Sequence, residues 1–172
     1  MNADNNQTTN LISTETAIFA AGCFWGVEFY LQKENGVLST SVGYIGGAKE
    51  QPTYEEVKSH ITGHAEAVKV VFDSAQTSFE KLARLFFEIH DPTQTDGQGP
   101  DIGPQYRSEL FYTTPEQKTI AEKLIAELQA KGYNVITKIT PATIFWEAEN
   151  YHQNYYEQKG EMPYCHTRVK RF

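Results

Sequence analysis

Cys23 lies in the segment Gly22-Cys23-Phe24-Trp25-Gly26, between an apolar run that is typical of a buried strand and a stretch with helical spacing. This pattern places the thiol at a strand-to-helix turn, at or near the N-terminus of the helix. Unpaired backbone N–H groups and the positive end of the helix dipole gather there, and both favour a thiolate over a thiol. Phe24 and Trp25 place two aromatic rings beside the sulfur, which suggests chemistry on a small apolar group.

The alternative for Cys23 is an inert role, because a cysteine in an apolar segment is often a buried small hydrophobic residue. The chain has one other cysteine, Cys165. Two cysteines in a domain of this size do not form a disulfide scaffold, although they can act as a redox pair.

A carboxyl group opens a valine-rich strand pattern at Glu66. Desolvation at the edge of an apolar strand keeps a carboxyl protonated, and a neutral carboxylic acid can deliver a proton at neutral pH. The alternative is an ordinary solvated glutamate at the start of a strand. Tyr54, Asp101 and Tyr106 belong to loops or loop edges, where polar residues often serve function.

Composition limits the class of protein. The 172 residues include 15 basic and 22 acidic residues, and the net charge of −7 argues against nucleic acid or an anionic membrane as the main partner. The polar N-terminus does not resemble a signal peptide, and no stretch approaches the roughly 18–20 apolar residues of a membrane-spanning helix. We expect a cytoplasmic protein with a disordered leader at 1–13 and a single catalytic domain at 14–172.

Periodicity and capping signals predict an element order of β-α-β-β-α-β-α-β. Strands are predicted at 14–21, 37–44, 65–72, 108–112 and 135–140, and helices at 24–34, 78–89 and 114–131, with a helical turn at 53–58. The first six main elements match a ferredoxin-like split βαβ arrangement. We therefore predict an α+β two-layer sandwich with a mixed, mainly antiparallel sheet. The segment 90–105 is predicted to lack regular structure, and the chain after Pro141 is predicted to be an irregular, aromatic, coil-rich tail.

Five blocks along the chain resemble, in order, the motifs of the peptide methionine sulfoxide reductase A family. They are GCFWG at 22–26; GYIGG at 43–47 with PTY at 52–54; GHAEAV at 63–68; HDP at 90–92 with DIGPQYRS at 101–108; and AENYHQ at 148–153 with YC at 164–165. Together they cover most of the chain from about 16 to 165.

The resemblance implies a role for each matching residue. It makes Cys23 the nucleophile, Glu66 the proton donor and Cys165 the resolving thiol. It implies that Tyr54 and Tyr106 hydrogen-bond the sulfoxide oxygen, that Asp101 supports this polar cluster, and that Phe24 and Trp25 hold the methyl group of the substrate.

The implied reaction is reduction of methionine-S-sulfoxide, free or in proteins, by a monomer without a metal or organic cofactor. Cys23 becomes a sulfenic acid, which condenses with Cys165 to a disulfide that thioredoxin reduces. A neutral Glu66 gives a thiolate little help, so we expect full activation of Cys23 only when substrate is bound. Some members of the family carry a further cysteine near the C-terminus, whereas the seven residues after Cys165 hold none, which implies a cycle with one disulfide.

Two other functions remain open at this point. A papain-like hydrolase would use His152, which follows Cys23 by 129 positions and has Asn150 and Asn154 nearby, but the sequence around Cys23 lacks that family's pattern. A redox sensor or methionine-binding module would use the thiols without turnover.

Three histidines also need an interpretation. We interpret His152 as a structural residue that bonds the tail to the body of the domain through a backbone or carboxyl oxygen. His60 and His64 have weak spacing for zinc, and no metal site is expected.

Overall fold

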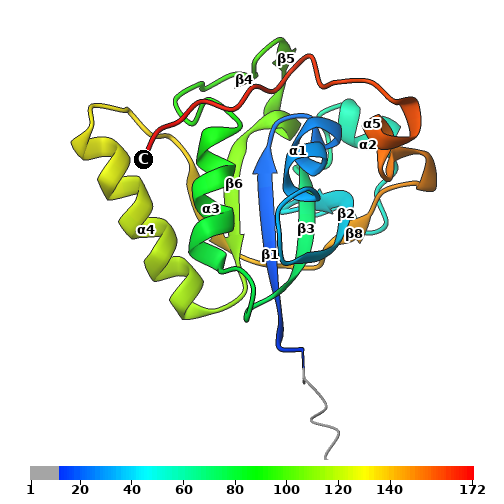
Figure 1. The fold of residues 1–172 in the computed structure, drawn as a ribbon. Coiled ribbons are helices and arrows are strands. Elements are labelled where there is room, and N and C mark those ends of the chain that lie inside the picture. Colours follow the sequence, from blue (N-terminus) through cyan, green and yellow to red (C-terminus); the bar gives the residue numbers. More distant parts are fainter. Residues whose placement is uncertain (1–11) are drawn as a thin grey trace, which may run out of the picture.

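A six-stranded sheet lies at the centre of the structure, a computed structural model that describes residues 12–172 (Figure 1). The strands in spatial order are β7 (Lys138–Pro141), β6 (Ser108–Tyr112), β1 (Thr14–Ala21), β3 (Ala65–Asp73), β2 (Val37–Ile45) and β8 (Trp146–Glu147). All neighbours are antiparallel except the parallel pair β6 and β7. The predicted leader lies outside the described residues except for Ile12 and Ser13.

The central four strands form the predicted split βαβ arrangement. β1 crosses over through α1 (Phe24–Leu31) to β2, and β3 returns from β2 to lie between them. α3 (Phe79–Glu88) then leads towards β6 on the other side of β1. The predicted α+β fold with a mixed, mainly antiparallel sheet is confirmed.

The main core lies between the sheet and the three long helices. Period-2 alternation on β1 turns Phe19 towards the helices and Ile18 towards the opposite face, where a smaller apolar cluster forms. α3 presents Leu82 and Phe86 to the core, and α4 (Pro115–Ala130) adds Leu124 and further apolar residues. Figure 1 shows α1, α3 and α4 on one side of the sheet.

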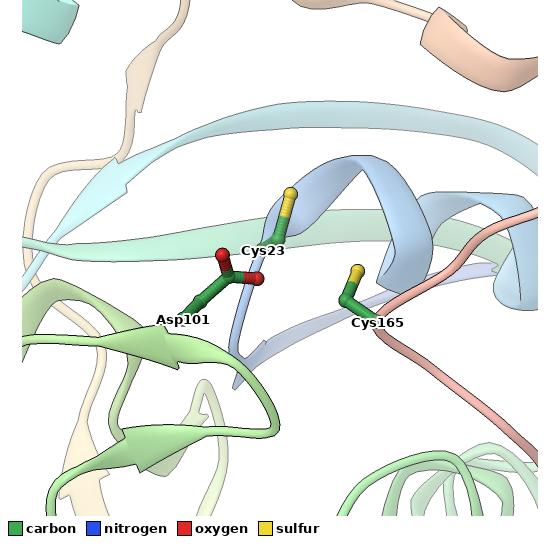
Figure 2. A group of neighbouring side chains, drawn as sticks. All are labelled: Cys23, Asp101 and Cys165. Carbon is green, nitrogen blue, oxygen red and sulfur yellow. The ribbon is translucent and has the colours of Figure 1, made fainter.

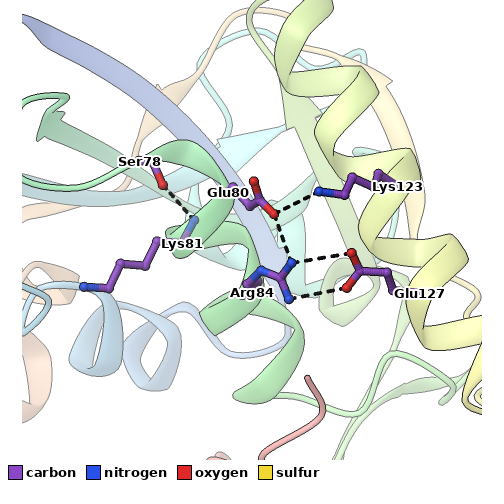
Figure 3. Close-up of polar contacts among 6 residues, drawn as sticks. All are labelled: Ser78, Glu80, Lys81, Arg84, Lys123 and Glu127. Carbon is purple, nitrogen blue, oxygen red and sulfur yellow. Dashed lines mark hydrogen bonds and ion pairs between the residues drawn. The ribbon is translucent and has the colours of Figure 1, made fainter.

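Charged side chains connect α3 to α4 where the two helices meet solvent. Arg84 on α3 contacts Glu80 on its own helix at 2.9 Å and Glu127 on α4 at 3.4 Å, while Lys123 reaches Glu80 at 3.4 Å (Figure 3). The Ser78 hydroxyl accepts the Lys81 backbone N–H at 3.1 Å and so caps α3. Because these ion pairs are partly exposed, each contributes about 1 kcal/mol or less.

Two predicted elements are shorter than expected. The helix predicted at 24–34 ends at Leu31, because residues 32–36 make tight turns that carry the chain straight into β2. Gly36 completes this reversal at φ +88°, where a side chain would meet Thr77. The strand predicted at 135–140 begins only at Lys138, because Ile136 instead donates its N–H to Pro92 in a loop.

The prediction that 90–105 lacks regular structure is wrong in part. The segment contains the two-residue strands β4 (Gly97–Gln98) and β5 (Asp101–Ile102) and leads into the 3₁₀ turn η1 (Pro104–Tyr106). The Gln98 side chain accepts the Asp91 N–H and donates to the Asp91 carbonyl, both at 2.9 Å. These two side-chain hydrogen bonds help to hold the short hairpin in place, because it has fewer backbone hydrogen bonds than a longer hairpin would have.

The tail after Pro141 is also more ordered than predicted. It contains β8 and η2 (Asn150–His152), followed by α5 (Tyr155–Lys159). The Gln153 side chain accepts the Val42 N–H at 2.9 Å and donates to the Val42 carbonyl at 3.0 Å, while Asn154 donates its N–H to the buried Glu28 carboxylate. The tail is therefore anchored to β2 and α1 through polar side chains.

Within residues 12–172, no helix combines the length and the apolar character needed to cross a membrane.

We predict that Phe86→Ala lowers the free energy of unfolding by about 3–5 kcal/mol, because Phe86 is fully buried and its ring lies 5.1 Å from that of Phe19. Arg84→Ala is the control on the same helix; it removes two partly exposed ion pairs and should cost at most about 2 kcal/mol. Urea denaturation measures both. Equal losses for the two variants would contradict this assignment of core and surface.

Candidate active site

The predicted site residues converge on one edge of the sheet. β1 and β2 end there, and β3 and β6 begin there, because neighbouring strands are antiparallel: Ala21 pairs with Ser108, and Ile45 pairs with Ala65. Only Gly22 separates Cys23 from the end of β1, and Glu66 is the second residue of β3. The edge therefore brings the thiol and the carboxyl together.

Cys23 occupies the N-cap position of α1, as the sequence predicted. Gly22 precedes it at φ +93°, a conformation that favours glycine, and a Cβ on Gly22 would approach the Gln98 side chain to 2.6 Å. The turn therefore allows the β4–β5 hairpin to lie directly against the segment that carries Cys23. The Cys23 side chain is buried.

Cys165 lies beside Cys23 although it is 142 positions later in the chain. Figure 2 shows the two thiols and the Asp101 carboxyl grouped together, each on a different segment: the start of α1, the C-terminal tail and β5. The ligand atoms of these three residues all lie within 4.8 Å of one another. Both cysteines are free thiols, and the tail is already folded back across the site.

The two thiols share a hydrogen bond that shifts their pKa values in opposite directions. The pKa of Cys23 is raised by this bond to Cys165, by burial and by the charge of Glu66, while a hydrogen bond from the Trp25 amide opposes the rise. The pKa of Cys165 is lowered by the hydrogen bond from Cys23 and further by His166. In this substrate-free state the helix N-terminus therefore does not make Cys23 the more acidic thiol, contrary to the first expectation from its position.

Glu66 is a buried carboxyl, with 2% of its surface exposed. The backbone N–H of Phe24 donates to its Oε1 at 3.3 Å. Burial raises the pKa of Glu66 to about 8, against the weaker opposing effect of the Phe24 N–H. The alternative of a solvated glutamate is wrong, and the group is mainly protonated at neutral pH.

Tyr54 and Tyr106 enter the site from two short segments. Tyr54 begins α2 (Tyr54–Lys58) after a complete capping box at Thr53, and its N–H donates to Glu149 at 3.1 Å. Tyr106 is the last residue of η1. The next residue, Arg107, donates a hydrogen bond from its guanidinium to the Gly63 carbonyl at 3.0 Å and so fixes the end of η1.

The two tyrosines share one electrostatic environment. Burial and the charge of Glu66 raise the pKa of Tyr54 to about 12, and the same two causes raise the pKa of Tyr106 further. Both phenols therefore remain hydrogen-bond donors at neutral pH.

Asp101 faces the two thiols from β5. Its Oδ2 atom is buried and has no hydrogen-bond partner among the residues that the structure describes. Burial, followed by the charge of Cys165, raises the pKa of Asp101. The carboxyl thus adds a second acidic group beside the sulfurs.

Phe24 and Trp25 form an aromatic wall next to Cys23. Phe24 is fully buried, whereas Trp25 is half-buried and stacks on Tyr155 with 3.7 Å between the ring centroids. The Trp25 indole N–H donates to His152 Nδ1 at 3.0 Å. The ring of Trp25 is therefore held by two residues of the tail.

His152 bonds the tail to the body of the domain, as predicted, but through the Trp25 indole rather than through an oxygen. Because Nδ1 accepts this bond, Nε2 carries the proton, and it has no hydrogen-bond partner within residues 12–172. A neutral histidine in this state has no free lone pair to accept a proton from Cys23. This geometry argues against the papain-like arrangement.

His64 has a structural role in the loop before β3. Its Nδ1 accepts the Gly47 N–H at 3.0 Å, and its Nε2 donates to the Lys49 carbonyl at 2.7 Å. Both ring nitrogens are occupied, which argues against the weak zinc interpretation of His60 and His64.

Sequence reasoning gave no role to three residues that shape the site: Tyr44, Glu149 and His166. Glu149 accepts hydrogen bonds from the Tyr44 hydroxyl and from the Tyr54 backbone, and so positions Tyr54. His166 contacts Cys165 directly. Its position next to Cys165 in the chain was the available signal, whereas nothing in the sequence links Tyr44 to Glu149.

Comparison with known proteins agrees with this geometry. The family described as "Peptide methionine sulfoxide reductase" matches residues 15–172. The peptide methionine sulfoxide reductase MsrA of Geobacter sulfurreducens is 50% identical over 151 residues, which cover 86% of this chain and 93% of the relative.

Two solved structures of Mxr1 from Saccharomyces cerevisiae share the fold. The reduced form has a TM-score of 0.85 at 32% identity and covers 90% of this chain and 92% of its own. The complex with Trx2 has a TM-score of 0.63 at 25% identity, and the match covers 94% of this chain and 96% of the other. The chain belongs to the peptide methionine sulfoxide reductase family.

Proposed function

We propose that this protein reduces methionine-S-sulfoxide, free or in proteins, to methionine, and so repairs oxidised proteins. The observation that carries the proposal is the protonated Glu66 at the same buried edge as Cys23, with a second thiol within reach. A sulfoxide becomes a good electrophile only when its oxygen is protonated or strongly hydrogen-bonded. The site offers a proton donor and a sulfur nucleophile in one place.

In the first step, Glu66 gives its proton to the sulfoxide oxygen while Tyr54 and Tyr106 donate hydrogen bonds to it. The Cys23 sulfur attacks and takes the oxygen, so that methionine leaves and Cys23 becomes a sulfenic acid. Substrate binding changes the relative pKa values of the two thiols, so that Cys23 loses its proton and reacts as the thiolate. The raised pKa of substrate-free Cys23 supports this order of events.

The methyl group of the substrate contacts Phe24 and Trp25. The stacking of Trp25 on Tyr155 and its bond to His152 support this role, because a fixed aromatic surface binds a small apolar group with little loss of side-chain entropy. Asp101 supports the polar side of the site.

In the second step, Cys165 attacks the Cys23 sulfenic acid, an S–S bond forms and water leaves. Thioredoxin then reduces the Cys23–Cys165 disulfide. The complex of the related Mxr1 with Trx2 supports this partner. Tyr164, next to Cys165 and 71% exposed, offers an aromatic contact for it.

The protein works as a monomer in the cytoplasm, with residues 14–172 as one catalytic domain. Every proposed site residue comes from one chain, which supports a monomer. Thiols that cycle through a disulfide need a reducing compartment with a dithiol protein, which supports the location.

We predict that the wild type consumes the S epimer of methionine sulfoxide and leaves the R epimer, with dithiothreitol as reductant, and that Cys23→Ser abolishes this turnover. Separate assays of the two purified epimers measure it. If neither epimer is consumed, the reductase proposal is wrong and the redox sensor becomes the better interpretation. If Cys23→Ser retains full turnover, the nucleophile is wrong.

We predict that the rate of methionine release falls as pH rises through about 8, because Glu66 then loses the proton that it donates. Glu66→Gln should lose this inflection and about 10²–10⁴-fold in rate. Glu122→Gln, on the exposed side of α4, is the matched control and should keep the wild-type profile. An unchanged profile in Glu66→Gln would remove Glu66 from the role of proton donor.

We predict that one turnover without reductant gives a Cys23–Cys165 disulfide in the wild type and a Cys23 sulfenic acid in Cys165→Ser. Mass spectrometry after trapping with dimedone distinguishes the two products. A persistent sulfenic acid or an intermolecular disulfide in the wild type would count against the cycle with one disulfide.

A further inference from the structure

His166 lies directly against the resolving thiol. Its Nδ1 is 3.0 Å from Cys165 Sγ, and its Nε2 is 2.7 Å from the Ala21 carbonyl oxygen at the end of β1. The side chain is buried. Neither step of the proposed reaction assigns a role to this histidine.

The hydrogen bonds determine which ring nitrogen can accept a proton. A carbonyl oxygen only accepts hydrogen bonds, so Nε2 carries the N–H that faces Ala21. Nδ1 therefore presents its lone pair to the sulfur of Cys165. This is the arrangement of a base beside a thiol.

The surrounding backbone holds the imidazole in this position. A Cβ on Gly26 would overlap the ring at Nδ1, so the glycine makes room for it on α1. The Tyr30 hydroxyl donates to the backbone carbonyl of His166 at 3.2 Å. The ring thus occupies a fitted space between the end of β1 and the first turn of α1.

We propose that His166 is the catalytic base of the second step: it takes the proton from Cys165 and holds the resulting thiolate ready to attack oxidised Cys23. The proposal rests on the proposed function, because it assigns a residue to that reaction. It goes beyond the family motifs, which end at Cys165 in this chain.

The step balances without a further reactant. The Cys165 thiol gives its proton to Nδ1, and the thiolate attacks the sulfur of the Cys23 sulfenic acid. The S–S bond forms as the S–O bond breaks, and the hydroxide takes back the proton and leaves as water. The contact with His166 lowers the pKa of Cys165, after the larger contribution of Cys23, as expected when Nδ1 takes the thiol proton and pairs as an imidazolium with the thiolate.

Other titratable groups around His166 must be separated from it in any test. They are Cys165 and Cys23, Asp101, His90 and Tyr30. Burial lowers the pKa of His90 to about 3, so this residue stays neutral over the range of interest. Asp101 is common to all the variants below and does not distinguish them.

The first test needs no turnover. In a Cys23→Ser background, the ultraviolet absorbance of the Cys165 thiolate is followed against pH, with the Cys23→Ser/Cys165→Ser protein as blank. His166→Asn should move the thiolate titration upward by about one pH unit or more. An unchanged titration overturns the proposal, even if the protein proves to be an active reductase.

The second test is a single turnover with one equivalent of methionine-S-sulfoxide. The release of methionine and the loss of free thiols are timed separately. His166→Asn should slow disulfide formation about 10²-fold near neutral pH. The deficit should shrink at high pH, where Cys165 ionises without a base.

Tyr30→Phe is the matched control, because it removes the contact with the His166 backbone and leaves the imidazole in place. It should slow the rate of disulfide formation only slightly, and by the same factor at every pH. A loss in His166→Asn that is equally independent of pH would mean a structural role and overturn the proposal. Absence of methionine release in the wild type would instead defeat the proposed function and leave the first test to decide on His166.

Discussion

The pairing of the two thiols and the positions of Trp25 and Tyr54 depend on the attachment of the C-terminal segment across β2 and the start of α1. The segment brings Cys165, Glu149 and His152 to residues that the first third of the chain supplies. Besides the stack of Trp25 on Tyr155, partly buried polar groups hold it: Gln153 bonds to the Val42 backbone, and the buried Glu28 carboxylate accepts the Asn154 N–H. Such bonds are strongly directional, and a buried polar group left unpaired costs about 1–3 kcal/mol. The attachment therefore selects one position of the tail.

Desolvation then decides where the protons lie. The same buried edge that keeps Glu66 protonated keeps Tyr54 and Tyr106 as donors. Burial also disfavours two thiolates side by side, so Cys23 and Cys165 share their hydrogen bond with opposite shifts. The chemistry of the site follows from the exclusion of water as much as from the identity of its residues.

Local signals predicted most of the sheet and placed Cys23 and Glu66 at the ends of its strands. The apolar run before Cys23, the glycine beside it and the valine-rich pattern after Glu66 each depend on near neighbours, so one sequence is enough to interpret them. The roles of Tyr54, Tyr106 and Asp101, and the specific pairing of Cys23 with Cys165, came from the family resemblance instead. In that case the order of motifs replaced the missing information about three-dimensional contacts.

The features that sequence reasoning missed depend on contacts between distant positions. Trp25 and His152 are separated by 127 positions, and His166 and Ala21 by 145. No periodicity reports such a pair. The short strands β4, β5 and β8 were missed for a different reason: each ladder has only two residue pairs, too few to give a periodic pattern in the sequence. In β4 and β5 the side-chain amide of Gln98 adds two hydrogen bonds to Asp91.

The Gln153 amide has a consequence for the sheet itself. β8 pairs with only Gly43 and Tyr44 of β2, and the Ala148 N–H just after β8 donates to the Val42 carbonyl at 2.9 Å. Gln153 satisfies the Val42 N–H, which this backbone pairing leaves over, and its amide N–H shares the Val42 carbonyl with Ala148. Unpaired strand edges are templates for aggregation. The residue that anchors the tail carrying Cys165 therefore also removes one unpaired N–H from the outer side of β2.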